Sequence, residues 1–180
     1  MKAQTDNPAT RRCFLQLAGG VAVTSVLGRS TAFAARPAER PAPATADPAQ
    51  VETKIRALRE NKYSCSQATF LGICTTFGGS LTEEQLMALS AGFAGGIGRT
   101  YNEGTCGALA AGVMAAGFYL PGQAEQAITI AKELFEQFKK REGSVICKDI
   151  LQKYGGFGNC TNCCLNVGHD VAEMVRNLNA

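Results

Sequence analysis

The placement of proline and the spacing of apolar residues restrict most of this chain to helical structure. Of six prolines only Pro121 lies beyond residue 48, so little interrupts the segments whose apolar side chains recur at helical spacing. No stretch of convincing length alternates apolar and polar residues as a half-buried strand would. We therefore expect an all-α fold, a compact bundle of about six helices, built from residues 49–180.

Capping signals locate several of these helices. Gly78 should end a segment that begins at Ser64, and Thr82 with Gln85 forms a capping box for the next helix. The long helices are expected over 49–61, 64–78, from 82, 104–119, 122–141 and up to about 178, with a short one near 144–153. The apolar stripe of the 122–141 helix is expected to consist of Ile128, Ala131, Phe135 and Phe138.

The first 34 residues have the features of a twin-arginine signal peptide. Arg11 and Arg12 form the arginine pair, a weakly apolar run from Phe14 to Leu27 follows, and residues 32–34 offer a cleavage site. The run is too short for a mature membrane-spanning helix, which needs about 20 residues. Residues 35–48 hold four of the six prolines and form a Pro/Ala-rich linker before the helical domain.

The signal bears on localisation and on cofactor content. The twin-arginine pathway carries proteins that have already folded, commonly with a cofactor inserted in the cytoplasm, and so predicts a periplasmic protein. The formal charge of +3 resides in the first 34 residues, which leaves the exported part close to neutral. Such a balance gives no support for nucleic-acid binding.

The cysteine and histidine content narrows the chemistry. The chain has one histidine, His169, so bis-histidine haem and histidine-based zinc or copper sites lack ligands. Haem c is not encoded, because Leu165 rather than a histidine follows Cys164. Iron–sulfur clusters, cysteine-only zinc sites and dithiols remain. Beyond the signal lie seven of the eight cysteines, an odd number that cannot all pair within one chain: Cys65, Cys74, Cys106, Cys147, Cys160, Cys163 and Cys164.

Cys106 stands where a helix is expected to begin. At that position the unpaired N–H groups and the helix dipole stabilise a thiolate. Gly104 and Gly107 on either side let the backbone come close to an inorganic centre or to another helix. Arg99, in the glycine-rich segment before them, either neutralises an anionic cluster or pairs with Glu103.

The other cysteines differ in the helix faces that they occupy. Cys65 and Cys74 are nine residues apart, half a turn out of phase on one helix, and Cys74 is expected in the core. Cys160 and Cys163 form a C-x-x-C pair, which serves zinc, iron–sulfur and dithiol chemistry alike. Relative to the apolar stripe of the last helix, Cys160 and Cys164 lie close and Cys163 lies further off, while the sole histidine falls almost opposite.

Four parts of the chain resemble a known family. They are "YSCSQA" (63–68), "GGIGRTYNEGTCGALAAG" (95–112), "CKDIL" (147–151) and a late cysteine before an amphipathic helix. Together they resemble the redox-active proteins named for their C–GCAxxG–C–C cysteine pattern, over residues 50–178. Split-Soret cytochromes carry a similar domain beside haem c, whose motifs are missing from this sequence.

The resemblance implies redox activity and a set of four cysteines. On this match they are Cys65, Cys106, Cys147 and either Cys163 or Cys164, with Cys164 favoured by its helix face. Alanine occupies position 111, where the family has the last glycine of its motif. Four thiolates from separate segments match the ligation of both [2Fe–2S] and [4Fe–4S] clusters.

Three functions compete at this stage. The leading one is an exported iron–sulfur protein that acts as an electron carrier or redox subunit, rather than an enzyme with its own substrate. The second is a thiol–disulfide oxidoreductase that uses Cys160, Cys163 and Cys164. The third is a non-catalytic bundle stapled by zinc or disulfides. The first implies a redox partner protein, membrane-associated partners included, and permits a homo-oligomer.

Overall fold

The computed structural model describes residues 47–120, 122–156 and 160–177. The expected signal peptide and all of the linker except its last two residues lie outside this range. The described residues form seven α-helices and no strand, which confirms the all-α prediction with one helix more than six. Their bounds are α1 (Pro48–Glu60), α2 (Cys65–Phe77), α3 (Glu83–Ala91), α4 (Gly107–Tyr119), α5 (Ala124–Glu142), α6 (Cys147–Tyr154) and α7 (Thr161–Asn177).

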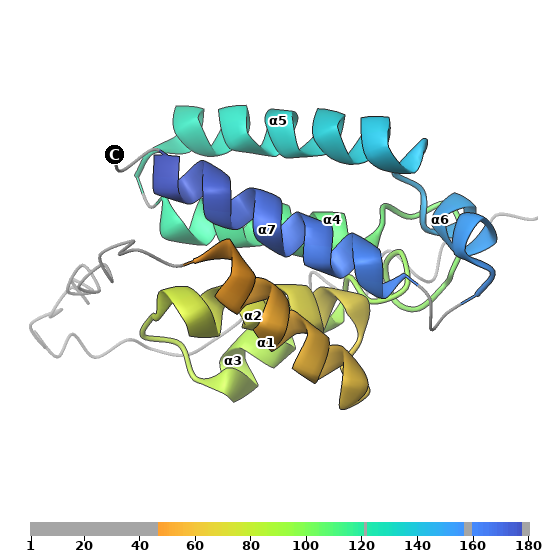
Figure 1. Ribbon diagram of the computed structural model, residues 1–180, viewed down its shortest axis with the longest axis horizontal. Helices are drawn as coiled ribbons and strands as arrows, with labels where there is room; N and C mark the ends of the chain where they lie inside the picture. The colour runs from red at the N-terminus through yellow and green to blue at the C-terminus, as the bar shows by residue number, and fades with distance from the viewer. Residues whose placement is uncertain (1–46, 121, 157–159, 178–180) are drawn as a thin grey trace, which may run out of the picture. The chain divides into compact units, whose positions relative to one another are not determined.

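Four helices form the centre of the bundle, and α5 and α6 add side chains to its core. Helix α1 packs against α2 and α7, and α4 packs against the same two helices from the other side. Figure 1 shows α1 and α7 in front of α2 and α4, with α5 along the outer side of α4 and α7. No helix in the described part of the chain is both long and apolar enough to cross a membrane. The largest fully buried side chains are Val51, Ile55, Phe70, Leu71, Ile73, Leu109, Leu134, Phe138, Ile150, Val167, Val171 and Val175.

Glycines let α1 approach its two neighbours closely. Gly72 of α2 and Gly168 of α7 both face Ile55, and a Cβ atom on either glycine would collide with that side chain. Ile55 is fully buried as a result. The bundle therefore gains van der Waals contact where bulkier residues would hold the helices apart.

The capping expectations are confirmed at two helices. Ser64 and Thr82 are the N-caps of α2 and α3, each with a complete capping box, and Gly78 ends α2 with a φ of 77°. These signals succeed because the side chain of the cap satisfies backbone N–H groups locally, whatever the tertiary packing.

Two expectations about helices are wrong. Helix α4 begins at Gly107 rather than near residue 104, because Thr105 instead forms an antiparallel bridge with Ile146. On α5 the predicted burial of Phe138 is confirmed, but the other buried apolar residues are Ile130 and Leu134, whereas Ile128 is 61% exposed. The predicted stripe and the observed stripe both have helical spacing. The periodicity alone therefore did not identify the face of α5 that packs against α4 and α7.

The glycine-rich segment between α3 and α4 forms a left-handed turn. Five consecutive residues, Gly95 to Arg99, have positive φ values between 57° and 70°. Glycine adopts this conformation freely, but Ile97 and Arg99 carry a Cβ atom and are strained in it. The turn is closed by backbone hydrogen bonds, including Arg99 N–H to the Ala94 carbonyl at 2.7 Å.

Candidate functional site

The starts of four helices carry cysteine and meet at one end of the bundle. Cys65 is the first residue of α2, Cys106 is the N-cap of α4, and Cys147 is the first residue of α6. Cys163 and Cys164 lie in the first turn of α7. Figure 1 shows the N-terminal ends of α4 and α7 beside α6. The fold thus gathers thiols that are up to 99 residues apart in sequence.

A short backbone pairing fixes two of these thiols. The N–H of Cys106 donates to the Val145 carbonyl at 2.7 Å, and the N–H of Cys147 donates to the Gly104 carbonyl at 2.8 Å. These hydrogen bonds flank the bridge between Thr105 and Ile146. The starts of α4 and α6 are therefore held side by side by the backbone itself.

Because glycine has no side chain, the backbone at three glycines packs closely around the cysteines. A Cβ atom on Gly107 would lie 2.7 Å from the Sγ of Cys65. A Cβ atom on Gly96, in the left-handed turn, would lie 2.5 Å from the Cβ of Cys147. Gly104 packs directly on the backbone of Gly96. The sequence indicated that Gly104 and Gly107 permit a close approach. In the structure the groups that come close are a loop, at Gly104, and a thiol, at Gly107, of the chain itself.

Cys164, in the first turn of α7, lies next to Cys65 and Cys160. Its side chain is fully buried, and its S–H donates to the carbonyls of Cys65 and Cys160 at 3.8 and 3.7 Å. Burial raises its pKa well above the usual value for a thiol, and negative charge on Cys65 raises it further. The guanidinium of Arg59 acts in the opposite direction.

The sulfur of Cys106 faces the start of its own helix. The backbone N–H groups of Leu109 and Ala108 lower its pKa, although the Cys106 side chain makes no capping hydrogen bond. Burial has the larger effect and, together with negative charge on Cys65, raises the pKa of Cys106 to about 12. Burial likewise raises the pKa of Cys147 to about 11. Without a metal, these thiols are protonated at neutral pH.

Cys163 has a different environment. It is fully buried, so the expectation that it lies away from the apolar side of α7 is wrong. Burial raises its pKa, negative charge on Cys106 and on the buried carboxylate of Glu142 raises it further, and the side chain of Tyr154 at the end of α6 acts in the opposite direction. The hydroxyl of Tyr154 donates to that carboxylate at 2.9 Å.

A pocket of about 250 Å³ opens beside the thiols. Cys65, Cys147 and Cys160 line it, and Arg59 and Arg99 contribute two of its cationic side chains. Arg99 therefore faces the thiol site, and no ion pair joins it to Glu103 among the described residues. The complete lining is Arg59, Lys62, Tyr63, Ser64, Cys65, Ala94, Gly95, Arg99, Tyr101, Cys147, Leu151 and Cys160.

Arg59 is the site residue that sequence reasoning missed, and Cys160, expected to act only in the thiol–disulfide alternative, lies beside it. Cys160 precedes α7 and is partly exposed, with the Nη2 of Arg59 4.0 Å from its sulfur. Arg59 also donates from Nη1 to the Tyr63 carbonyl at 2.8 Å. Only the packing of the C-terminal end of α1 against α7 brings these residues together, so no local sequence signal marks Arg59.

Cys74 lies apart from this group. It is 3% exposed in the core, and the hydroxyl of Tyr119 donates to its carbonyl at 3.1 Å. Burial raises the pKa of Cys74 to about 12. The helical phase between Cys65 and Cys74 thus separates them, as expected.

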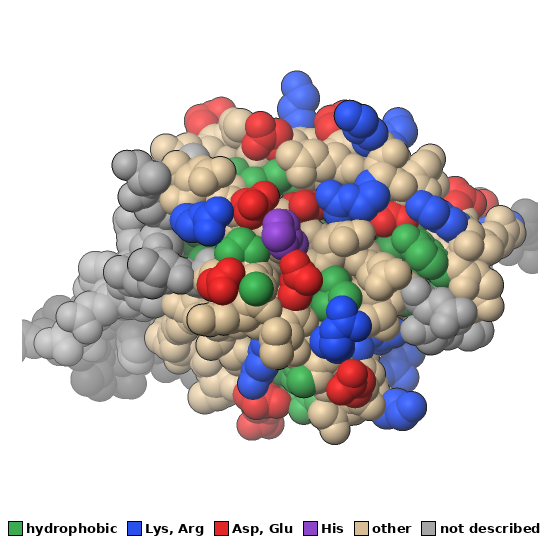
Figure 2. Space-filling model, in the orientation of Figure 1, with side chains coloured by type: hydrophobic (Ala, Val, Ile, Leu, Met, Phe, Trp, Pro, Cys, Tyr) green, Lys and Arg blue, Asp and Glu red, His purple; other side chains and the backbone are tan. Residues whose placement is uncertain are grey.

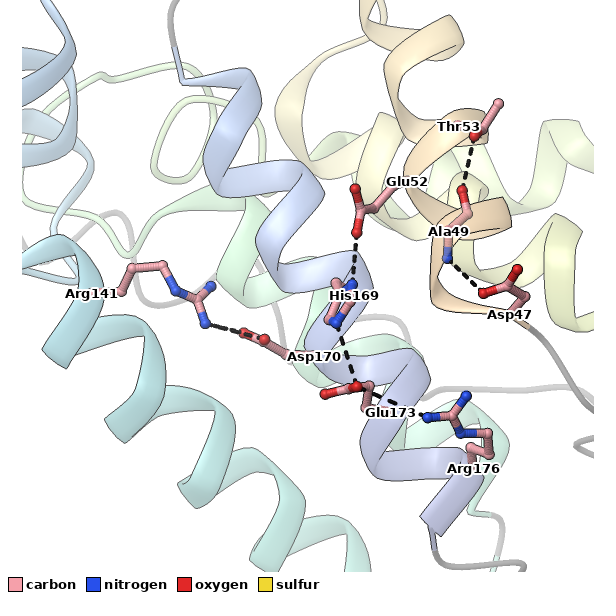
Figure 3. A network of polar contacts seen from close by, with 9 residues as sticks. All are labelled: Asp47, Ala49, Glu52, Thr53, Arg141, His169, Asp170, Glu173 and Arg176. Carbon is pink, nitrogen blue, oxygen red and sulfur yellow. Dashed lines mark hydrogen bonds and ion pairs between the residues drawn. The ribbon is translucent and has the colours of Figure 1, made fainter.

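His169 also lies outside the thiol site. Figure 2 shows it on the surface among acidic side chains, and Figure 3 shows its ring between Glu52 and Glu173. Its Nδ1 lies 2.6 Å from Glu52 on α1, and its Nε2 lies 3.5 Å from Glu173. The histidine therefore joins α1 to α7 at the surface.

The donor chemistry of the site is sulfur, supplied by six cysteines. All seven described cysteines are free thiols. No three His, Cys, Asp or Glu side chains of the described residues surround a point that a single metal ion could occupy. Thiolates from several helices, with arginine nearby, are nevertheless the donor set that suits an iron–sulfur cluster.

Fold and site together define an all-α protein with clustered, buried thiols. The chain belongs to the family described as "Putative redox-active protein (C_GCAxxG_C_C)", whose sequence profile matches residues 63–178. This confirms the family indicated by the cysteine pattern and supports a redox role. Neither curated proteins nor solved structures gave a match to the chain.

Proposed function

We propose that this protein binds an iron–sulfur cluster through Cys65, Cys106, Cys147 and Cys164 and carries electrons. The proposal rests on the proximity of the starts of α2, α4, α6 and α7, each of which brings a cysteine to the same end of the bundle. Helix starts favour negative charge, so they suit thiolate ligands. When bound, the cluster would supply one-electron chemistry, and the protein would hold and insulate it.

The cationic residues of the pocket support this proposal. An iron–sulfur core with four thiolates is an anion, and burying it requires compensating charge. Arg59 lowers the pKa of both Cys160 and Cys164, against the larger effect of burial, and so favours their thiolate forms. Because buried thiols are protonated in the free protein, loading a cluster would release protons.

Charge also discriminates among candidates for the fourth ligand. The carboxylate of Glu142 opposes negative charge on Cys163, while Arg59 favours it on Cys160 and Cys164. We therefore retain Cys164 over Cys163 and add Cys160 as its structural alternative. Cys160 also shares the pocket with Cys65 and Cys147.

Two matched cysteine variants test the proposal. Cys106 and Cys74 are equally buried, at 4% and 3% exposure, but only Cys106 lies in the thiol group. Iron and acid-labile sulfide would be measured per chain in protein purified without oxygen. The wild type should contain two or four of each, Cys106→Ser should contain neither, and Cys74→Ser should match the wild type. Loss in Cys74→Ser with retention in Cys106→Ser would overturn the assignment.

A second candidate function is thiol–disulfide exchange. It is favoured by the partial exposure of Cys160 beside Arg59, since an accessible thiol near a cation is a suitable nucleophile. Against it, burial raises the pKa of Cys160, Cys163 and Cys164. A chain with no iron or sulfide, whose Cys160 is alkylated rapidly at pH 7, would favour this function over the cluster.

The sequence also supports the proposal that the protein is exported to the periplasm and carries electrons there. The pair Arg11 and Arg12 directs a folded, loaded protein to the periplasm in this proposal, where a redox partner protein would exchange electrons with it. Replacing both arginines with lysine should retain the protein in the cytoplasm with its iron still bound. Export of that variant at the wild-type level would refute the twin-arginine route.

A further inference from the structure

The mouth of the thiol pocket gathers positive charge. Arg59, Lys62 and Arg99 line it, and none of its described lining residues is acidic. Among the described residues, none of these three cations takes part in an ion pair. Glu83 approaches the rim only by accepting a hydrogen bond from the Tyr63 hydroxyl at 3.0 Å, and it does not line the pocket. The positive charges of these side chains are thus not neutralised by a carboxylate of the described residues.

Backbone strain is concentrated at the same rim. Four non-glycine residues of the described chain have positive φ, and three of them line the pocket. They are Lys62 at 69°, Arg99 at 58° and Tyr101 at 52°. Such conformations are unfavourable for residues with a Cβ atom and cluster at binding sites. Here they set the directions of two cationic side chains, which supports a ligand site independently of the charge.

The third cation is held against the pocket wall. Arg59 donates from Nη1 to the Tyr63 carbonyl at 2.8 Å and from Nε to the Thr161 hydroxyl at 3.4 Å. These bonds orient the guanidinium before any ligand arrives, which lowers the entropy cost of binding. Its Nη2 lies 4.0 Å from the Cys160 sulfur, and the N–H groups that these three contacts leave free would donate to an anion.

The volume of the pocket restricts the ligand to a small one. At about 250 Å³ it lies below the range of about 300–1,000 Å³ that is typical for drug-sized ligands. We propose that the pocket binds a small inorganic oxyanion through Arg59, Lys62 and Arg99. This proposal goes beyond electron transfer, and it does not require that a cluster be present. An anion bound in this pocket would lie beside the partly exposed thiols of Cys65 and Cys160, a suitable position for the ionic substrate of a redox protein.

Sodium sulfate is a suitable probe because it is unreactive toward thiols. Calorimetric titration of the full-length chain at low ionic strength should give saturable binding at one site. Lys62→Gln/Arg99→Gln should weaken it by about tenfold or more. Lys132→Gln/Lys140→Gln, which removes the same charge from exposed positions on α5, should stay within about twofold of wild type. Absence of saturable binding, or equal loss in both double variants, would overturn the proposal.

A single variant separates lost binding from lost folding. Lys62→Gly removes a cation but also relieves the positive φ, so it should raise the melting temperature while it weakens sulfate binding. Unchanged binding in this variant would count against the site. Iron and sulfide would be measured in the same preparations. Sulfate binding by a chain purified without iron would refute only the cluster. A chain that is purified with iron, but does not bind sulfate once the iron has been removed, would refute only the anion site.

Discussion

The sulfur of Cys65 occupies the space where a side chain of Gly107 would be. A Cβ atom built on Gly107 would lie 2.7 Å from the Cys65 Sγ and 2.5 Å from the Phe93 carbonyl oxygen. The start of α4 therefore packs directly against the first thiol of α2. The glycine that follows Cys106 therefore has a steric role: it lets two candidate ligands approach each other.

Gly107→Ala should displace the Cys65 thiol from this position. The new methyl group would meet a backbone carbonyl that cannot rotate away, so we expect a loss of about 1–3 kcal/mol in unfolding free energy and a loss of bound iron. Gly117→Ala is the matched control, because it lies on the same helix with nothing within 4 Å of its Cβ position. That variant should gain up to about 1 kcal/mol and keep its iron. Equal unfolding free energies and equal iron contents in the two variants would contradict the steric role of Gly107.

The sequence predicted those parts of the fold that depend on local chemistry. The capping boxes at Ser64 and Thr82 and the stop at Gly78 are satisfied by side chains within a few residues, and the structure confirms them. The face of α5 was not predictable, because Phe135 and Leu134 both fit a helical stripe and only the packing partners decide between them. Likewise, the start of α4 depends on a bridge to Ile146, 41 residues beyond Thr105.

The candidate site was partly predictable for the same reason. Cys65, Cys106 and Cys147 follow from their positions at helix starts and from the family pattern. The approach of Arg59 to Cys160 depends on how α1 meets α7, which no local signal contains. The left-handed conformation of Arg99 was also beyond sequence reasoning, since arginine gives no indication of a positive φ.

The second prediction concerns the packing of two glycines against Ile55. The Cβ atom of alanine at position 168 would collide with the Cδ1 of Ile55, and at position 72 with its Cγ1. Each Gly→Ala change should lower the unfolding free energy by about 1–3 kcal/mol through overpacking. Thermal unfolding followed by circular dichroism would measure both.

A shorter side chain at position 55 should distinguish the two changes. Ile55→Val removes Cδ1 and retains Cγ1, so it should restore part of the stability of Gly168→Ala and none of that of Gly72→Ala. The single change Ile55→Val sets the reference, at a cost of about 0.5–1.5 kcal/mol. Additive losses in both double variants would mean that the helices shift apart instead of packing on Ile55.

The buried carboxylate of Glu142 leads to a third prediction. Its Oε2 accepts hydrogen bonds from Lys153 Nζ at 2.8 Å and Tyr154 Oη at 2.9 Å, and its side chain is fully buried. Lys153→Met should cost about 1–3 kcal/mol, because it removes one donor from a buried charge while Tyr154 remains. Lys148→Met, at an exposed position of the same helix, should change stability by less than about 0.5 kcal/mol. Urea unfolding would show whether the two lysines differ as expected.

The pH dependence of the metal-free chain provides the last prediction. Burial raises the pKa of Cys74 and of Cys106 to about 12, from 9.0 for an unperturbed thiol. Above pH 9 the unfolded chain releases these protons and the folded chain keeps them, so stability is present below pH 9 and lost as pH rises toward 12. Each thiol contributes at most about 1.4 kcal/mol per pH unit.

Urea unfolding of the reduced, metal-free chain at pH 8, 9 and 10 would measure this slope. Cys74→Ala should be less stable at pH 8 because of its cavity, yet it should lose less stability between pH 9 and 10 than the wild type. If the cluster is bound through Cys106, the loaded protein should also show a shallower slope, since its ligands are already deprotonated. A slope in Cys74→Ala as steep as in the wild type would show that the buried thiol does not resist ionisation, because the titration of this thiol is the pH-dependent difference between the two chains.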